Sequence, residues 1–125
     1  MEKSIEQLSI EFVDLCILQY EKMNSHLVKE ANKAFDKIYR IASKIRRTPD
    51  GGRDFLVKLV NHPHRNVRAH AAYLLFPIDQ QLSIKTLKEI ERNGEFAWEQ
   101  INARTCIEEW KAGRLDVDWF LKKYH

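Results

Sequence analysis

The spacing of apolar residues constrains this chain most strongly, because it follows the period of an α-helix along almost the whole length. Ile38, Ala42 and Ile45, for example, are four and three residues apart and would share one helical face. No stretch of six or more residues alternates in the manner of a β-strand. Four glycines and three prolines in 125 residues leave few points at which a helix must end. The sequence therefore predicts an all-α protein, with residues 1–125 as a single domain.

The few breakers and caps divide the chain into about six helices and a short C-terminal helical turn. Ser4 can cap the first helix, and Asn24 with Ser25 can interrupt it and cap the second. The segment TPDGG, residues 48–52, predicts the next turn. Four further helices are expected at residues 54–60, 66–75, 80–92 and 95–111. Because short turns make neighbouring helices antiparallel, these four form two stacked helix pairs, as in an α-solenoid.

Aromatic residues near the C-terminus leave two interpretations open. Asp116 can open a final helical turn in which Trp119 and Phe120 fold back to cover the sixth helix. Trp98, on the sixth helix, is then either covered by that turn or exposed for a partner. The sequence does not decide between the two.

The first residues contain glutamates at positions where a signal peptide would be cationic. No apolar run approaches the ~20 residues that a membrane helix needs. We therefore expect a cytoplasmic protein. Cys16 and Cys106 are ninety positions apart in apolar surroundings, and they are expected to be buried thiols rather than a disulfide.

Motifs for catalysis are absent from the sequence, including G-x-S-x-G, H-E-x-x-H, the P-loop and G-x-G-x-x-G. His62, His64 and His70 could in principle supply three imidazoles to zinc, but no cysteine lies near them in the sequence. A surface turn followed by a helix start is the favoured interpretation of this segment. We expect no enzymatic activity, no metal and no cofactor.

The same segment, NHPHRNVRAHAAYLL at residues 61–75, resembles the second half of a HEAT repeat. The matching residues are Pro63, Val67, Arg68, Ala71, Ala72 and Leu75. His64 departs from the pattern, which prefers a capping Asp there. The resemblance implies that Arg68 pairs across repeats, and that His70 and Tyr73 face solvent or a partner.

Residues 5–112 as a whole resemble a bacterial family of small HEAT-like domains, catalogued as the domain of unknown function with the number two thousand and nineteen. This resemblance implies a HEAT-like α-α superhelix. Members of that sort turn up as immunity proteins beside secreted toxins. The resemblance thus implies a non-enzymatic protein-binding module, an immunity protein that binds and neutralises a toxin encoded nearby.

Helical repeats bind partners through the outward stripe of the second helix in each pair. The residues expected on this stripe in the fourth and sixth helices are Asn66, His70, Tyr73, Trp98, Asn102 and Thr105. Nucleic-acid binding is the alternative, because residues 37–70 hold nine Lys or Arg and two Asp, a formal charge of +7. The residues proposed for that basic patch are Arg46, Arg47, Arg53, Lys58 and Arg65. Solvated helix faces and helix ends explain the same charges more simply.

Overall fold

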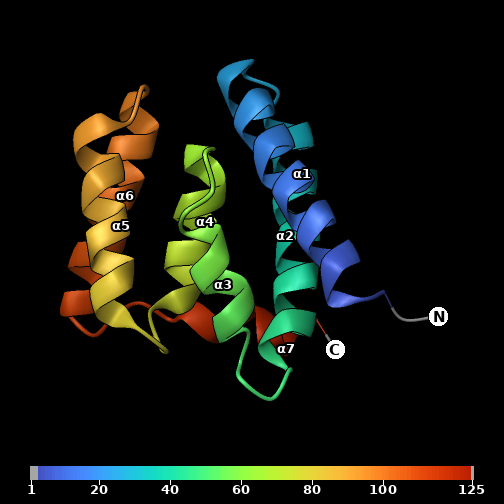
Figure 1. Cartoon of the computed structure of the whole chain (residues 1–125). Coiled ribbons are helices and arrows are strands. Elements are labelled where there is room, and N and C mark those ends of the chain that lie inside the picture. Colours follow the sequence, from blue (N-terminus) through green and yellow to red (C-terminus); the bar gives the residue numbers. More distant parts are fainter. Residues whose placement is uncertain (1–2, 125) are drawn as a thin grey trace.

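The computed structural model describes residues 3–124, in which consecutive helices pair into three antiparallel hairpins that lie side by side (Figure 1). In each hairpin the first helix lies in one layer and the second helix in the other. The hairpins are α1 (Ile5–Asn24) with α2 (Val28–Arg46), α3 (Arg53–Leu59) with α4 (Arg65–Leu75), and α5 (Gln80–Asn93) with α6 (Ala97–Lys111). A 3₁₀ turn at Val117–Trp119 leads into α7 (Phe120–Lys123). The described residues contain helices and no strand, which confirms the all-α prediction.

Most helix ends lie where the sequence places a cap or a breaker. Ser4 Oγ accepts a hydrogen bond from the Gln7 amide at 3.2 Å, and Asp79 Oδ1 accepts one from the Leu82 amide at 3.1 Å. Gly52 takes a φ of 89° in the turn before α3, where a Cβ would collide with Ile45 Cγ2. His64 caps α4, because its Nδ1 accepts from the Asn66 amide at 3.1 Å. The His64 imidazole thus accepts the N-cap hydrogen bond that an Asp side chain accepts in the HEAT pattern.

The expected cap of the second helix is wrong. Leu27 occupies the N-cap of α2 without a side-chain hydrogen bond, and it follows His26, whose φ is 59°. Asn24 is instead the last residue of α1, with Ser25 as its C-cap. The tight left-handed turn leaves neither side chain next to the first amides of α2.

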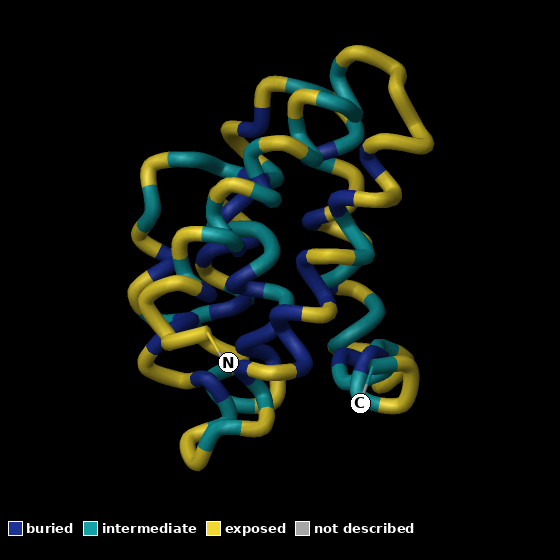
Figure 2. The backbone as a smooth tube through the Cα atoms, turned by 90° about the vertical axis from the view of Figure 1, so that its right-hand side faces the viewer, coloured by how far each residue is buried: buried dark blue, intermediate teal, exposed yellow. Residues whose placement is uncertain are grey.

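The core lies between the two layers, where facing helix sides bury their apolar residues, and Figure 2 shows exposed positions along the turns and outer helix sides. On α1 the apolar contact runs along Leu8, Phe12 and Cys16. Ile10 is 63% exposed, so the second apolar stripe of this helix is not covered along its whole length. Cys16 and Cys106 are both free thiols, the first buried and the second half-buried. Within residues 3–124 no helix is long and apolar enough to cross a membrane.

The C-terminal segment packs on α2 and α4, so the expectation that it covers the sixth helix is wrong. Gly113, with a φ of 73°, turns the chain after α6. Asp118 Oδ1 then accepts a hydrogen bond from Arg46 Nε of α2 at 3.0 Å. Phe120 is completely buried, and the Trp119 ring stacks on Phe35 with centroids 6.1 Å apart. An ion pair at the end of α2 and aromatic burial along this helix thus decide where the segment lies.

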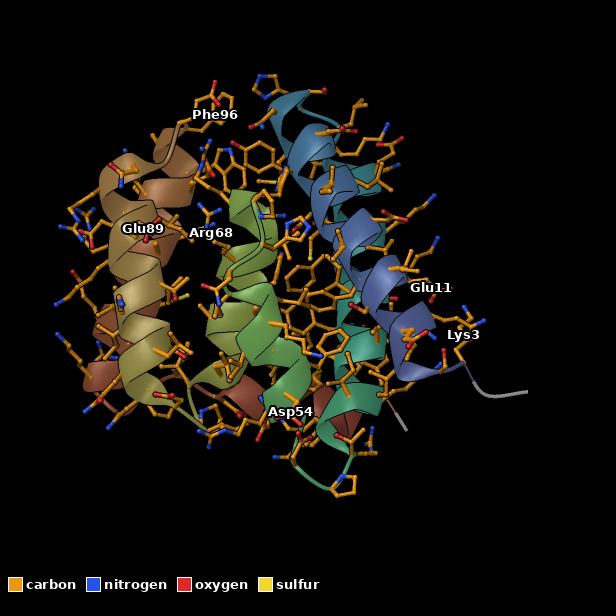
Figure 3. The ribbon with its side chains drawn as sticks, viewed as in Figure 1. Lys3, Glu11, Asp54, Arg68, Glu89 and Phe96 are labelled. Atoms are coloured by element: carbon orange, nitrogen blue, oxygen red, sulfur yellow. The ribbon has the colours of Figure 1, made fainter. Side chains whose placement is uncertain are left out.

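Arg68 does not pair across hairpins, which corrects a second expectation. Its Nη1 donates to the carbonyl oxygens of His62 and Pro63, both at 2.8 Å, in the turn before α4 (Figure 3). Two other arginines link separate hairpins: Arg46 of α2 donates to the Leu74 carbonyl oxygen of α4, and Arg65 Nε donates to Glu99 Oε1 of α6 at 3.1 Å. Arg65 begins α4, one turn earlier, and there it reaches the amino-terminal end of α6.

Candidate functional site

A groove of about 310 Å³ opens on the side of the stack formed by α2, α4 and α6. All six residues that the sequence proposed for partner binding line it. Asn66, His70 and Tyr73 come from α4, and Trp98, Asn102 and Thr105 come from α6. The two even-numbered helices run parallel, because each follows an odd-numbered helix and a turn (Figure 1). Outward stripes that are thirty-two residues apart in the sequence therefore become facing walls of one depression.

A hydrogen-bonded network forms the α4 side of the groove. Tyr39 Oη and His70 Nδ1 are 2.9 Å apart, and His70 Nε2 lies 2.6 Å from Gln19 Oε1. Because the amide oxygen of Gln19 can only accept, Nε2 carries the imidazole proton and Nδ1 accepts from the Tyr39 hydroxyl. Burial lowers the pKa of His70 to about 4. The imidazole is therefore neutral at physiological pH and is committed to this network.

Asn66 belongs to the same network, and its predicted outward position is wrong. The residue is 6% exposed, and its Nδ2 donates to the Cys16 carbonyl oxygen at 2.6 Å and to Gln19 Oε1 at 2.9 Å. His70 is likewise half-buried rather than freely offered to solvent. The reason is α1, which packs against α4 and covers the amino-terminal part of its outward stripe.

The α6 side of the groove is more open. Asn102 and Thr105 are exposed. Trp98 is half-buried, its Nε1 donates to Asn24 Oδ1 at 2.9 Å, and its ring lies 5.5 Å from that of Tyr20. Trp98 is thus covered in part by the end of α1, and neither of the two interpretations that the sequence left open describes it fully. One face of the indole still lines the groove.

A charged cluster closes the amino-terminal end of the groove, where α4 and α6 begin. We call Tyr20, Arg65 and Glu99 the polar joint. Tyr20 Oη donates to Glu99 Oε2 at 3.0 Å and accepts from Arg65 Nη2 at 3.0 Å, in addition to the Arg65–Glu99 pair. Hydrogen bonding to the Glu99 carboxylate raises the pKa of Arg65. Phe96, whose amide donates to Glu99 Oε2 at 3.0 Å, marks this end in Figure 3. The joint connects α1, α4 and α6.

An aromatic cluster closes the opposite end. We call Phe35, Tyr73 and Trp119 the aromatic joint. Trp119 Nε1 donates to Tyr73 Oη at 3.0 Å, and Tyr73 Oη donates to the Asp116 carbonyl oxygen at 3.3 Å. Burial raises the pKa of Tyr73 to about 12, so the hydroxyl stays protonated. Tyr73 is therefore half-buried between the groove and the C-terminal segment.

The chemistry of the groove suits binding by contact. Glu99 is the one carboxylate among its lining residues, and the polar joint already neutralises it. Burial raises the pKa of the Cys106 thiol, which disfavours the nucleophilic thiolate. The His70 imidazole is held neutral in its network, and the remaining lining is aromatic, aliphatic, amide or hydroxyl in character. No free base and no activated nucleophile of the described residues face the groove.

Sequence reasoning missed the wall that α1 and α2 supply, made of Gln19, Phe35 and Tyr39. Phe35 gives a weak signal, because it lies beside the main apolar stripe of α2 rather than within it. Gln19 gives none, because a glutamine in an amphipathic helix is ordinarily a solvated residue.

The five residues of the alternative basic patch do not form one free surface. Arg46 donates to the Gly51 carbonyl oxygen at 3.0 Å and pairs with Asp118, and its side chain is 10% exposed. Arg47 donates to the Tyr124 carbonyl oxygen at 2.9 Å, and Arg65 lies in the polar joint at the other end of the stack. Arg53 and Lys58 are exposed on α3. Nucleic-acid binding stays a prediction, which a gel shift at low salt would test.

The three histidines of residues 61–75 face different partners. His62 Nδ1 accepts from the His64 amide at 3.0 Å, His64 Nδ1 caps α4, and His70 bonds to Tyr39 and Gln19. Burial lowers the pKa of His64. Within residues 3–124 no three His, Cys, Asp or Glu side chains gather as a metal-binding group.

A sequence model of the family described as a domain of unknown function, DUF2019, matches residues 6–110. The chain belongs to this family. The DUF2019 match contains the polar joint and both helices that carry the six proposed residues, and it ends before the C-terminal segment. The family description assigns no activity to the groove.

One solved structure has the same arrangement of helices as this DUF2019 domain. The crystal structure of protein RPA1889 from Rhodopseudomonas palustris CGA009 matches with a TM-score of 0.84, over 92% of this chain and 94% of that chain. The two sequences are 18% identical, so the likeness shows the fold alone. None of the curated proteins compared matches this DUF2019 domain.

Proposed function

We propose that the chain is a non-enzymatic protein-binding module that contacts its partner through the groove between α2, α4 and α6. The observation that carries the proposal is the gathering of Tyr73, Trp98, Asn102 and Thr105 around one open depression without a free charge. Aromatic residues dominate the energetic centres of protein interfaces, because they bring large contact areas at low cost in side-chain entropy. The finer form, an immunity protein that neutralises a toxin encoded nearby, rests on the family resemblance.

The size and lining of the groove support contact with a side chain of a partner. Its volume of about 310 Å³ lies at the lower limit of the ~300–1,000 Å³ typical of small-molecule pockets. Leu87, Ile90 and Ala103 form an apolar bottom, whereas the exposed Asn102 and Thr105 supply hydrogen bonds at the edge. An apolar centre within a polar rim is the usual anatomy of a protein interface.

The two joints hold the groove walls before a partner arrives. The polar joint links α1, α4 and α6, and the aromatic joint links α2, α4 and the C-terminal segment. A wall that is fixed in the free protein loses little entropy when the complex forms. Preorganisation of this kind favours tight binding by a small surface.

Co-expression with the product of the neighbouring gene tests the proposal. We expect the two proteins to co-purify and this chain to suppress any toxicity of the neighbour. Thr105→Arg fills the open edge of the groove and should weaken the complex by about 10-fold or more, as loss of a central contact does. Gln81→Arg adds the same group at an exposed position of α5 outside the groove and should leave the affinity within about twofold, as for contacts away from a hot spot.

A toxic, well-folded neighbour that does not bind this chain would contradict the immunity role. Equal affinities of the Thr105→Arg and Gln81→Arg variants would contradict the use of the groove while leaving binding itself intact. Calorimetry or surface plasmon resonance on the purified pair measures both quantities.

A further inference from the structure

A row of cations lies on α2, on the side of this helix turned away from the groove-lining Phe35. Lys29, Lys33 and Lys37 are four residues apart on this helix, so their side chains stand on one face, and all three are exposed. We call these three residues the cationic ridge. None of the ion pairs within residues 3–124 involves them. The ridge therefore presents positive charge that is not held in an ion pair within residues 3–124.

Three carboxylates lie near the ridge: Asp36 on α2, and Glu11 and Asp14 of α1, which line a neighbouring depression with Lys37. A shallow depression on α2 is lined by the ridge together with Asn32, Asp36 and Arg40. Asp36 Oδ2 accepts from Arg40 Nε at 3.1 Å, and its Oδ1 accepts from the Tyr124 hydroxyl. These contacts lower the pKa of Asp36, the hydrogen bond from Tyr124 being the largest cause. Asp36 is thus held toward Arg40 and the C-terminal segment, and Glu11 pairs with Lys3. The six cations that line the two depressions outnumber the three carboxylates, so this side of α2 keeps a net positive charge.

The ridge and the groove share α2 as a common border. Phe35 lines the groove, and Asn32, one helical turn before it, lies in the depression with Lys29 and Lys33. A helix with its side chains is about 10–12 Å across, so a segment that leaves the groove must pass over Asn32 and around α2 to reach the ridge. An extended segment of about five residues spans that distance. The two surfaces differ sharply in charge, because the only carboxylate lining the groove is paired with Arg65.

This difference defines the chemistry of the occupant. A charged side chain in the groove would lose its hydration without meeting a free opposite charge, which is costly. An uncharged aromatic or large aliphatic side chain would instead gain contact with Phe35, Tyr73 and Trp98. Outside the groove, carboxylates would meet the cationic ridge and would also speed the encounter by long-range attraction.

We propose that the partner is an acidic protein segment, which inserts an uncharged bulky side chain into the groove and lays carboxylates along the cationic ridge. This inference rests on the proposed function, because it assumes that the groove is the contact surface. It goes beyond that function by naming the chemistry of the segment that binds.

Three fluorescein-labelled twelve-residue peptides test the inference on the full chain by fluorescence anisotropy. The first carries one central tryptophan flanked by glutamates, the second has alanine in place of the tryptophan, and the third has lysines in place of the glutamates. We expect the first peptide to bind at least about 10-fold more tightly than either of the others, since both the anchor and the charges contribute. Its affinity should fall as salt is raised, because the ridge is exposed and therefore screened.

Charge-reversal variants of the protein test whether the cationic ridge is the surface that binds the glutamates of the peptide. The double variant Lys33→Glu with Lys37→Glu should weaken the first peptide by about 10-fold at low salt. Lys85→Glu with Lys88→Glu makes the same change at exposed positions of α5 outside the groove and the ridge, and it should change the affinity by less than about twofold. Circular dichroism of both variants shows whether they keep the helical content of the parent chain.

Tighter binding of the lysine peptide than of the glutamate peptide would overturn the inference. So would equal effects of the two double variants, or the absence of saturable binding by the glutamate–tryptophan peptide. None of these outcomes would change the expected result of the co-purification experiment, because a neutral or basic partner could still occupy the groove. Failure of the inference and failure of the proposed function are therefore distinguishable.

Discussion

The two ends of the groove are held by opposite means. The polar joint rests on a buried carboxylate, since the Glu99 side chain is 4% exposed and accepts from Arg65 and Tyr20. The aromatic joint rests on ring packing, with Phe35 and Trp119 stacked within 4° of parallel. A directional, charge-assisted contact fixes the relative position of the helices it joins, whereas apolar packing contributes mainly through the area it buries.

We therefore expect the two joints to have different roles, one in aligning the hairpins and the other in stabilising the fold. The polar joint should determine how the hairpins align, because its donors and acceptors have few other partners, and breaking it leaves a buried charge unpaired. The aromatic joint should contribute more of the folding free energy, because Phe120 beneath it is completely buried. The predictions below test this division, from the largest expected effect to the smallest.

Phe120→Ala should have the largest effect. The ring packs against Tyr39 and Trp119, with centroids 5.6 and 5.8 Å away, and its removal leaves a cavity under the aromatic joint. The free energy of unfolding should fall by about 3–5 kcal/mol, as for other buried Phe→Ala changes. Urea denaturation followed by circular dichroism measures the change. Leu121→Ala, at a half-buried neighbour, should cost less than half as much, and equal costs would contradict the importance of Phe120.

Glu99→Gln should have the next largest effect, at the polar joint. The neutral amide cannot accept from Arg65, Tyr20 and the Phe96 amide together, so at least one donor loses its partner. A loss of about 2 kcal/mol is expected, less than for a fully buried pair because the Arg65 side chain is 27% exposed. Thermal or urea unfolding measures it.

Glu95→Gln is the matched control for that change. Glu95 contacts the same Arg65 at 3.3 Å, but its side chain is 68% exposed. The loss should therefore be about 0.5 kcal/mol or less, as for most surface ion pairs. Similar costs for the Glu95 and Glu99 variants would show that burial does not distinguish the two pairs.

Acid should weaken the network between the two joints. The folded-state pKa of His70 is about 4, below the value of about 6.5 in an unfolded chain, so the unfolded state binds the proton more readily. Stability is therefore full above pH 6.5 and falls as the pH drops from 6.5 towards 4. The expected loss is about 2 kcal/mol, less than the full shift implies because part of the ring is open to solvent.

Urea titrations at several pH values, on the parent chain and on His70→Gln, isolate this effect. His64, whose pKa is also lowered, adds a loss of the same sign to both proteins, so the difference between them reports His70. Parallel pH profiles for the two proteins would mean that the folded state protonates His70 without cost.

Helix positions followed from local chemistry, and for that reason the sequence predicted them well. The Ser4 and Asp79 caps and the glycine turn at residues 51–52 act through neighbours in the sequence. The stripes on α4 and α6 met in one groove for a similar reason, because parallel helices in a stack turn equivalent faces to one side. The fold class and most of the proposed residues thus needed only helical periodicity.

The differences between expectation and structure in the groove and the C-terminal segment arose where a distant segment competes for a side chain. Asn66 is buried because α1 covers it, and Trp98 is covered in part by the end of α1 rather than by the C-terminal turn. The C-terminal turn lies on α2, where Arg46 and Phe35 receive it. Periodicity states which face of a helix is apolar, but it does not state which of several helices will cover its edges.

Two tryptophan substitutions each remove a single hydrogen bond at one joint, and they should have the smallest effects on the free energy of unfolding. Trp98→Phe removes the indole donor to Asn24 beside the polar joint, and Trp119→Phe removes the donor to Tyr73 in the aromatic joint. Each keeps an aromatic ring, so the change isolates one hydrogen bond of about 0.5–1.5 kcal/mol.

Trp119→Phe should cost about 1 kcal/mol, because it leaves the half-buried Tyr73 hydroxyl without a donor. Trp98→Phe should cost about half of that, because Asn24 ends α1 at the edge of the stack and water can replace the indole. Urea denaturation of the two variants side by side gives the ranking. A larger cost for Trp98→Phe would reverse the proposed division, because the amino-terminal end of the groove would then stabilise the fold as well as align its hairpins.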